Sequence, residues 1–311
     1  MTTVVNSLEF LSGGDIRYFV FILFLTFGFS ETILVPDEYP TIQSGIDAAI
    51  GGDSVLVGPG TYNESIDYNA KQIIVMSTDG PSNTIINHSY KTVKFEHQEG
   101  PGTILRGFTL AGLGDYGIYL SEDAHPTLQD LVITNKERAI YFNWNCDINL
   151  MNVTLVGNDY GIYGNYQSQI TLTNSIIWNN SSSPIYITNN SSSLSISYSN
   201  IQGGEINIGG SGTINWGEGN ITDDPLFCDS DNNDYTLAEN STSIGMGALG
   251  VGCDPIDGGD IYTGLWYISV DGSDDGDGTI DNPFLTIQSG IDAAIGGDSV
   301  LVGPGTYNES I

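Results

Sequence analysis

Apolar residues recur through the middle of the chain at spacings of 21 to 24 residues. Three apolar columns share this spacing: Ile118, Ile140, Ile162, Ile185 and Ile206; Leu105, Leu128, Leu150, Leu172 and Ile196; and Leu110, Ile133, Leu155, Ile177 and Ile201. Apolar and polar residues alternate around each member, as in half-buried strands. One unit of this length cannot bury its own apolar face, whereas stacked units share a continuous core. The pattern therefore predicts an all-β parallel solenoid with one coil per repeat.

A fourth column indicates a turn that recurs once per coil. Only glycine and asparagine occupy it: Gly112, Asn135, Gly157, Asn179 and Gly203. These are the two residues that enter the left-handed backbone region at little cost. We therefore predict one tight turn with positive φ at each of these positions.

Ahead of the regular repeats, the pattern changes from strand to helix. Short strands are expected at Thr32–Val35, Asp53–Val57, Gln72–Met76, Thr84–Asn87 and Thr92–Phe95. Between the first two, Ile42, Ile46 and Ile50 share one helical face, and Gly51 and Gly52 follow them. A terminal coil needs its apolar end covered, so residues 41–50 predict a short N-terminal capping helix.

The chain is strongly acidic. It has 311 residues, of which 7 are Lys or Arg and 38 are Asp or Glu, for a formal net charge of -31. Nucleic acids and anionic membranes both require a basic surface, so neither is expected as a partner.

The N-terminus and the cysteines indicate export. Arg17 precedes the apolar run Tyr18–Phe29, which is short for a membrane span and typical of a signal peptide. We predict a signal peptide over residues 1–30, a secreted or cell-surface protein, and no membrane insertion after cleavage; an uncleaved anchor and a mis-assigned start are the alternatives. Cys228 and Cys253 bracket the last part of the solenoid and could form a disulfide, whereas Cys146 lies alone. Three reduced thiols are the alternative.

The end of the sequence repeats its beginning. Residues Thr286–Ile311 are identical to Thr41–Ile66. We therefore predict a β-helix domain over residues 31–253, a linker over 254–264, and the truncated start of a second unit over 265–311. A fragment of a tandem array is favoured over an assembly artefact, because the second copy has its own preceding strand, Leu265–Val270, and an acidic loop.

The segment PTIQSGIDAAIGGDSVLVGPGTYNESI, at Pro40–Ile66, resembles the opening of right-handed parallel β-helix proteins of the pectin-lyase-like superfamily. Residues Tyr267–Gln288 resemble the N-terminal signature of a secreted β-helix family of unknown function. The resemblance implies a right-handed parallel β-helix over most of the chain. The catalytic signatures of polygalacturonases and pectin methylesterases are absent, and His88, His97 and His125 lie in other contexts. No catalytic set transfers, so whether the protein is an enzyme, and then a polysaccharide lyase or a glycoside hydrolase, stays open.

One face of the solenoid offers candidate substrate-binding residues. If the isoleucines of the x-Ile-Tyr-x strands point inward, the tyrosines point outward and form a row with flanking aromatic residues. The candidates are Tyr119, Tyr141, Tyr163, Tyr186, Trp144 and Tyr166. Flat aromatic rings with polar tips suit sugar rings. The alternative is that the stacked rings only stabilise neighbouring strands.

Charged residues border the same face. Asp115, Glu137 and Asp159 form one column, with Lys136 and Arg138 beside it. Three adjacent carboxylates repel one another unless a cation, or Arg138 and Lys136, compensates them. This arrangement suits calcium ligands or an acid/base pair for a glycosidic bond, and the version to test first has Arg138 or Lys136 as the base for β-elimination of a uronate. A solvated acidic turn is the alternative.

A second candidate calcium site is the loop that contains Asp271, Asp275 and Asp277, for which the alternative is an acidic surface loop. Two functional classes remain. The chain is expected to be a secreted β-helix that binds, or also modifies, polysaccharide. Alternatively, it is a non-enzymatic surface or adhesin-type repeat protein that acts as a rigid spacer.

Overall fold

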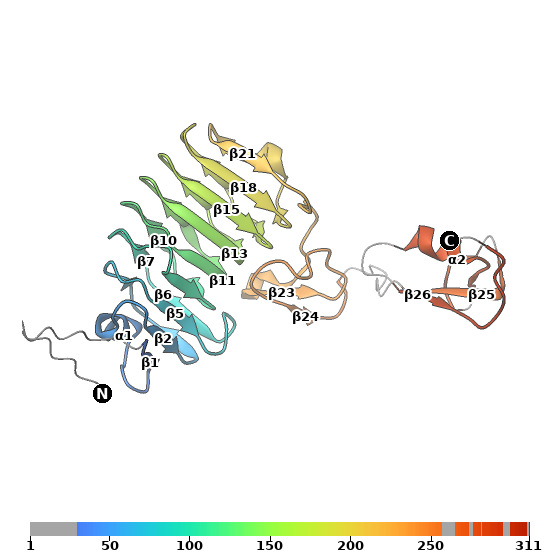
Figure 1. The fold of residues 1–311 in the computed structure, drawn as a ribbon, viewed down its shortest axis with the longest axis horizontal. Coiled ribbons are helices and arrows are strands. Elements are labelled where there is room, and N and C mark those ends of the chain that lie inside the picture. Colours follow the sequence, from blue (N-terminus) through green and yellow to red (C-terminus); the bar gives the residue numbers. More distant parts are fainter. Residues whose placement is uncertain (1–29, 257–264, 274–275, 281, 295–298, 310) are drawn as a thin grey trace, which may run out of the picture.

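The computed structural model describes residues 30–256, 265–273, 276–280, 282–294, 299–309 and 311. The expected signal peptide up to residue 29, most of the expected linker, and Asp275 lie outside the described residues. Residues 30–256 form a parallel solenoid followed by a short tail (Figure 1). No helix in the described parts of the chain is long and apolar enough to cross a membrane.

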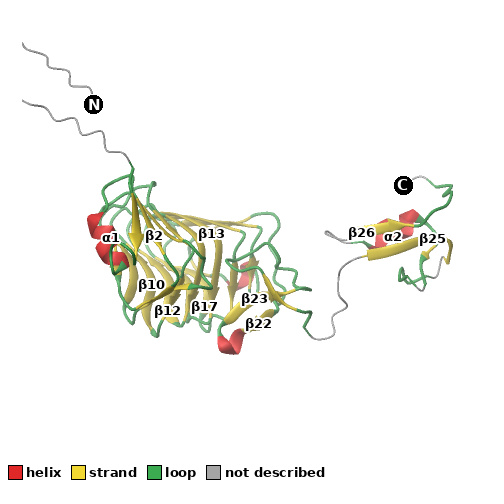
Figure 2. Ribbon diagram, turned by 90° about the horizontal axis from the view of Figure 1, so that it is seen from below, coloured by secondary structure: helices red, strands yellow, loops and turns green. Residues whose placement is uncertain are grey.

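Two long parallel sheets form the walls of the solenoid. Sheet A runs in the order β1 (Thr32–Val35), β2 (Ser54–Val57), β5 (Ile74–Ser77), β8 (Ile104–Arg106), β11 (Thr127–Thr134), β13 (Asp147–Val156), β15 (Gln169–Thr173), β18 (Ser193–Ser197) and β21 (Thr213–Trp216). Five shorter strands extend it sideways: β3 (Gly60–Tyr62), β6 (Thr84–Asn87), β9 (Thr109–Ala111), β16 (Ile176–Trp178) and β19 (Asn200–Ile201). Sheet B contains β4 (Ile66–Asp67), β7 (Lys91–Phe95), β10 (Gly114–Leu120), β12 (Lys136–Phe142), β14 (Tyr160–Gly164), β17 (Ser183–Ile187) and β20 (Gly209–Gly210). Figure 2 shows β10, β12 and β17 following one another along one wall.

The apolar columns predicted from the sequence are in register. Ile118, Ile140, Ile162 and Ile185 are partners across successive strands of sheet B. The two leucine and isoleucine columns of sheet A pair in the same way. All of these side chains are almost fully buried and belong to one continuous core. The fold class is therefore confirmed: the coils bury together what one coil leaves exposed.

The prediction for the last member of the sheet B column, Ile206, is wrong. Ile206 does not pair with Ile185; it lies in a 3-10 helix, Glu205–Asn207, and is 92% exposed. The strand comes later, and Gly209 pairs with Tyr186. The cause is the preceding Gly203–Gly204 pair, where both residues have positive φ and turn the chain away from the strand direction.

The column of glycine and asparagine forms the predicted turn. The φ values are 90°, 61°, 66°, 52° and 75° at Gly112, Asn135, Gly157, Asn179 and Gly203. This turn leads from sheet A back to sheet B once per coil. After the first four of these turns the chain re-enters sheet B as β10, β12, β14 and β17, whereas after the fifth, at Gly203, the 3-10 helix Glu205–Asn207 comes first.

The predicted N-terminal helix is α1 (Ile42–Ala48), which ends before the extended residue Ala49. Thr41 caps it through a capping box with Ser44. Ile42 and Ile46 are fully buried against the first coil. A Cβ atom at Gly45 would lie 2.9 Å from a methyl carbon of Val35, so glycine allows the helix to pack closely on β1.

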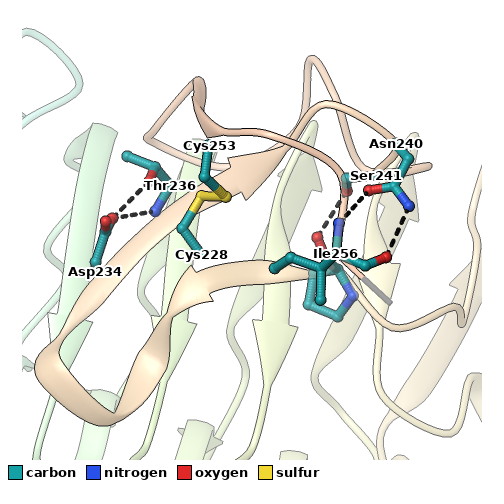
Figure 3. Close-up of a disulfide and its surroundings, with 8 residues drawn as sticks. Cys228, Asp234, Thr236, Asn240, Ser241, Cys253 and Ile256 are labelled. Atoms are coloured by element: carbon teal, nitrogen blue, oxygen red, sulfur yellow. Dashed lines mark hydrogen bonds between the residues drawn. A yellow bond between two sulfur atoms is a disulfide. The ribbon is translucent and has the colours of Figure 1, made fainter. Parts of the chain in front are cut away.

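The tail after the last coil folds against the side of the solenoid. It contains β22 (Phe227–Asp229), the 3-10 helix Ser230–Asn232, β23 (Asp234–Ala238) and β24 (Val251–Cys253). The disulfide between Cys228 and Cys253 joins its first and last strands (Figure 3). Cys146 is a buried free cysteine. Tyr235 packs on Val132 and Val156 of sheet A. The tail thus protects apolar residues on the outside of the coils.

Residues 265–311 contain the start of a second unit, which we describe by itself. Strand β25 (Leu265–Ser273) pairs in parallel with β26 (Ser299–Val302), and α2 (Ile287–Ala293) lies between them in sequence. This order matches that of β1, α1 and β2.

Candidate functional site

Four tyrosines form a ladder on the outer face of sheet B. Tyr119, Tyr141, Tyr163 and Tyr186 are partners in successive strands. Their ring centroids lie 5.1, 6.1 and 5.5 Å apart, and neighbouring rings are inclined by 27°, 18° and 20°. In-register parallel pairing places equivalent side chains about 4.8 Å apart, which is close to a ring-stacking distance. The sequence alternation therefore produces the ladder directly.

The ladder presents ring edges and hydroxyl groups to solvent. Because the rings are nearly parallel and stacked along the solenoid axis, each face is largely covered by its neighbour. Beyond Tyr186 the next rung is Gly209, where a Cβ atom would lie 2.5 Å from Tyr186 Cδ2. The row is thus a series of phenol groups that can form hydrogen bonds, rather than a series of open aromatic faces.

A second column lies beside the ladder and alternates cations with tyrosines. Its members, in register, are Lys91, Tyr116, Arg138 and Tyr160. The Arg138 Cζ atom lies 4.9 Å from the centroid of Tyr163 and 5.6 Å from that of Tyr116. Lys91 Nζ lies 3.4 Å from the centroid of Tyr119. Each cation is therefore held over the electron-rich face of a tyrosine.

Positive charge is concentrated on this wall. Of the seven Lys and Arg residues in the chain, four lie on two strands of sheet B, β7 and β12. Three of these make ion pairs on the outer face: Lys91 with Glu96, Lys94 with Asp67 at 3.0 Å, and Arg138 with Glu137 at 2.9 Å. In a chain with a net charge of -31, this is the wall that carries most of the cations.

Arg138 has a hydrogen-bond donor to spare. Its side chain is 21% exposed, and among the described residues its buried Nε atom has no hydrogen-bond partner. Its other contacts are the Glu137 carboxylate and three tyrosine rings. Burial raises the pKa values of the neighbouring Tyr116 and Tyr119 phenols, so these groups stay protonated above their usual range.

Lys136 does not accompany Arg138 on the outer face. It is 3% exposed, and Nζ donates hydrogen bonds to the carbonyl oxygens of His88 at 2.7 Å and Ala111 at 2.8 Å. Burial lowers its pKa to about 8. Strand alternation does not explain the difference, because residues two positions apart share a face. Lys136 is the first residue of β12, directly after the turn at Asn135, and its side chain reaches the carbonyl groups there instead. The two candidate bases are therefore not brought together.

The candidate calcium ligands have separate partners. Glu137 pairs with Arg138, and Asp159 accepts a hydrogen bond from Ser181 Oγ at 2.9 Å. Asp115 is half-buried at the start of β10. Within the described ranges, no group of three or more His, Cys, Asp or Glu side chains is placed to hold a metal ion.

In the acidic loop near the C-terminus, only part of the candidate set is described. Asp277 Oδ1 accepts hydrogen bonds from the hydroxyl and the amide of Thr279, which lower the pKa of Asp277. Asp271 donates its amide to Ser269 Oγ. These contacts stabilise the turns of the loop itself.

Trp144 and Tyr166 form a second aromatic pair, on the turn that follows sheet B. Their rings stack at 5.0 Å with an interplanar angle of 16°, and Trp144 is 59% exposed. Both residues have positive φ, which is costly for large side chains. Asn165 connects this turn to the ladder, because its Nδ2 donates to Tyr141 Oη at 3.1 Å. The pair thus extends the aromatic surface beyond the sheet.

The sequence periodicity does not reveal that Lys91 belongs to the column of cations and tyrosines. The 22-residue period that aligns the regular coils breaks before β10, because Lys91 pairs with Tyr116, 25 positions later. The alternation of cations and tyrosines becomes visible only with this register. The sequence contains one signal for this register: Val93 and Ile118, which are partners in the two strands, are also 25 residues apart.

Comparison with known families agrees with this architecture. Residues 73–242, more than half of the chain, match the family model described as "Right handed beta helix region". Comparisons with curated proteins and with solved structures found no match. The matched range begins just before β5 and ends in the tail after β23, so it spans both walls of the solenoid. The chain belongs to the right-handed β-helix family.

Proposed function

We propose that the outer face of sheet B binds an acidic polysaccharide, and that the protein does so outside the cell. The observation that supports binding is the tyrosine ladder, which offers one phenol per coil beside a column that alternates cations with tyrosines. Equivalent groups at a constant spacing suit a polymer that repeats the same polar groups. The sugar chain would then run along the solenoid axis.

The dimensions and the charge favour this ligand. Three steps of about 4.8 Å separate the first and last tyrosines, which is the length of a few sugar rings. The hydroxyl groups can donate to and accept from sugar hydroxyls. The partly exposed guanidinium of Arg138 and the ammonium groups of Lys91 and Lys94 carry N–H donors of the kind that bind carboxylates.

Binding is a better proposal than cleavage. The proposed lyase mechanism needs a base beside bound cation, but Arg138 pairs with Glu137, and a guanidinium keeps its proton in proteins. The Lys136 ammonium is buried below the surface. Of the three acids of the candidate calcium site, Glu137 pairs with Arg138 and Asp159 accepts a hydrogen bond from Ser181 Oγ.

A glycan array with neutral and uronate-containing oligosaccharides tests the proposal. We expect the purified chain to retain uronate-containing glycans, and Tyr163→Ala to weaken that retention. Tyr198→Ala is the matched control, because Tyr198 is an exposed tyrosine on the turn beside β18 of sheet A. A parallel assay should follow the ultraviolet absorbance of unsaturated lyase products and show no increase. Binding to no glycan, or equal effects of both variants, would contradict the proposal.

The second candidate function is a rigid spacer in a surface protein. The observation that favours it is the repeated segment at residues 286–311, which has the same sequence as residues 41–66. A spacer needs the stacked core but no ligand. The spacer function therefore predicts that the chain binds no glycan on the array and that the Tyr163→Ala variant has normal stability.

A further inference from the structure

Two exposed aromatic rings lie on the turns that lead from sheet B to sheet A, outside the tyrosine ladder. The turns after β10, β12 and β14 each contain two successive residues with positive φ, of which the first are Glu122, Trp144 and Tyr166. The turns are in register, because the Asp123 amide donates to Trp144 O at 3.1 Å and the Asn145 amide donates to Tyr166 O at 3.2 Å. Glu122, Trp144 and Tyr166 are all exposed and form one outward column.

Trp144 and Tyr166 have a backbone conformation that disfavours large side chains. Their φ values are 61° and 33°, in the region that glycine and asparagine enter at least cost. Residues held in such a conformation are concentrated at ligand-binding and active sites. Burial does not explain them here, because Trp144 is 59% and Tyr166 is 49% exposed. The solenoid therefore holds two aromatic rings in solvent at some cost in stability, which indicates a role outside the core.

Trp144 offers the open ring face that the tyrosine ladder lacks. Among the described residues its one ring contact is with Tyr166, at 5.0 Å and an interplanar angle of 16°. On its other side lies the turn of the preceding coil, where Glu122 occupies the equivalent position. Because a single ring covers it and 59% of the residue is exposed, the second face of the indole is accessible. A flat molecule on that face would continue the stack by one ring.

Hydrogen-bond acceptors border this face. The Asp123 side chain is 53% exposed, and its Oδ1 atom accepts a hydrogen bond from Asn145 Nδ2. Glu122 is exposed beside it. Ionised carboxylates only accept hydrogen bonds, so a ligand here must supply donors such as hydroxyl groups.

The charge of these turns selects against acidic ligands. Residues 121–126, 143–147 and 165–169 contain three acids, Glu122, Asp123 and Asp147, and no lysine or arginine. A ligand carboxylate would be repelled by them. A ligand for the open face of Trp144 therefore has a flat apolar face, several hydroxyl groups and no negative charge.

We propose that the open face of Trp144 binds one ring of a neutral β-linked glucan, whose hydroxyl groups donate to Glu122 and Asp123. A β-linked glucose ring has axial C–H groups on its faces, which pack on an aromatic ring. Its hydroxyl groups point outward around the ring edge, where charged acceptors give the stronger hydrogen bonds. This site differs from the outer face of sheet B in its residues and in its charge preference, so it does not rest on the proposed function.

Titration of the full chain with cellohexaose, measured by calorimetry, tests the proposal. Trp144→Gly should lower the affinity at least about tenfold, whereas Trp144→Phe should retain most of it because it keeps an aromatic face. Tyr198→Gly is the matched control and should have no effect. Tyr198 is also an exposed aromatic residue with positive φ, 50°, but it lies on a turn of sheet A and its hydroxyl donates to Glu218.

Urea unfolding separates a binding role from a structural one. Glycine adopts the left-handed conformation without strain, so the unfolding midpoint of Trp144→Gly should stay close to that of the wild type or rise. A fall as large as that of Ile140→Ala, a core truncation in the same coil, would mean that the ring pair only stabilises the turns, and would overturn the proposal.

Three binding results would also overturn it: no binding of cellohexaose to the wild type, unchanged binding to Trp144→Gly, or equal losses in Trp144→Gly and Tyr198→Gly. An oligogalacturonate of equal length distinguishes this site from sheet B. Its binding should be unaffected by Trp144→Gly. Loss of uronate binding alone would thus count against the proposed function, and loss of cellohexaose binding alone against the Trp144 site.

Discussion

The guanidinium carbon of Arg138 lies 4.9 Å from the centre of the Tyr163 ring, on the next coil of the solenoid. This contact joins the column of alternating cations and tyrosines to the tyrosine ladder. It also holds the one arginine of sheet B with its Nε–H free of protein acceptors in the described structure. Arg138 is therefore the residue whose removal should affect ligand charge preference most.

Arg138→Ala should lower the affinity for a uronate oligosaccharide by about tenfold, equal to about 1.4 kcal/mol. The cause is the loss of charge-assisted hydrogen bonds to carboxylate. Affinity for a neutral oligosaccharide of equal length should change little. Isothermal titration calorimetry measures both. Arg106→Ala is the control, because that guanidinium pairs with Asp130 on sheet A at 2.8 Å. Equal losses in the two variants would count against a site on sheet B.

Ile185→Ala and Ile206→Ala should differ widely in stability, although the sequence pattern treats the two residues alike. Ile185 is fully buried, so its truncation should cost about 2–5 kcal/mol. Ile206 is almost fully exposed, so its truncation should change the free energy of unfolding by less than about 0.5 kcal/mol. Urea unfolding followed by circular dichroism measures the difference. Similar losses of unfolding free energy in the two variants would instead support the register expected from the sequence, with Ile206 in the core.

This contrast shows what a solenoid sequence can and cannot predict. In-register stacking forces similar residues into equivalent positions, so Ile140 and Asn135 could be assigned to the core and to a turn from spacing alone. The capping helix followed from Ile42 and Ile46 on one face. Spacing fails where a coil has a different length, and Lys91 and Ile206 lie in such coils.

The direction of side chains near turns is a second property that the sequence pattern did not predict. Lys136 and Arg138 are two positions apart, which predicts the same face in an ideal strand. Lys136 instead reaches the carbonyl groups of Ala111, on the preceding coil, and of His88, on the coil before that. The stacking of the tyrosines was predictable, but the coverage of their faces depends on ring rotations that a sequence does not contain.

Asn135→Ala should destabilise the protein by about 1 kcal/mol, because φ is 61° there and an alanine Cβ is disfavoured in the left-handed region. Asn135→Gly should have a smaller effect, since glycine adopts this conformation without strain. Chemical denaturation of the two variants beside the wild type measures both. If alanine and glycine were equally tolerated, the turn geometry would not be the reason for the column.

The burial of Lys136 should make the stability of the fold depend on pH. Burial lowers the pKa of this amine from its usual value of 10.5 to about 8 in the folded chain. Between these two values the unfolded chain keeps the proton that the folded chain has lost, so stability from this group rises with pH. It is constant below about 8, where both states are protonated.

The measurement compares the wild type with Lys136→Met at pH 7 and pH 10. The free energy of unfolding of the wild type should gain about 2 kcal/mol relative to the variant across that interval. The difference between the proteins removes the titration of tyrosines, which both contain. A constant difference across the interval would mean that Lys136 keeps an ordinary pKa despite its burial.

The turns between strands are the places where a coil of this solenoid can change in length. Ile162 and Ile185 are 23 residues apart, and Leu172 and Ile196 are 24 apart, whereas the preceding coil uses 22 for both steps. The additional residues lie outside the strands, so paired positions are unaffected. A single insertion inside a strand would instead reverse every following side chain. Evolution can therefore add residues at the corners, or duplicate a whole coil, while the interior sequence pattern is inherited unchanged.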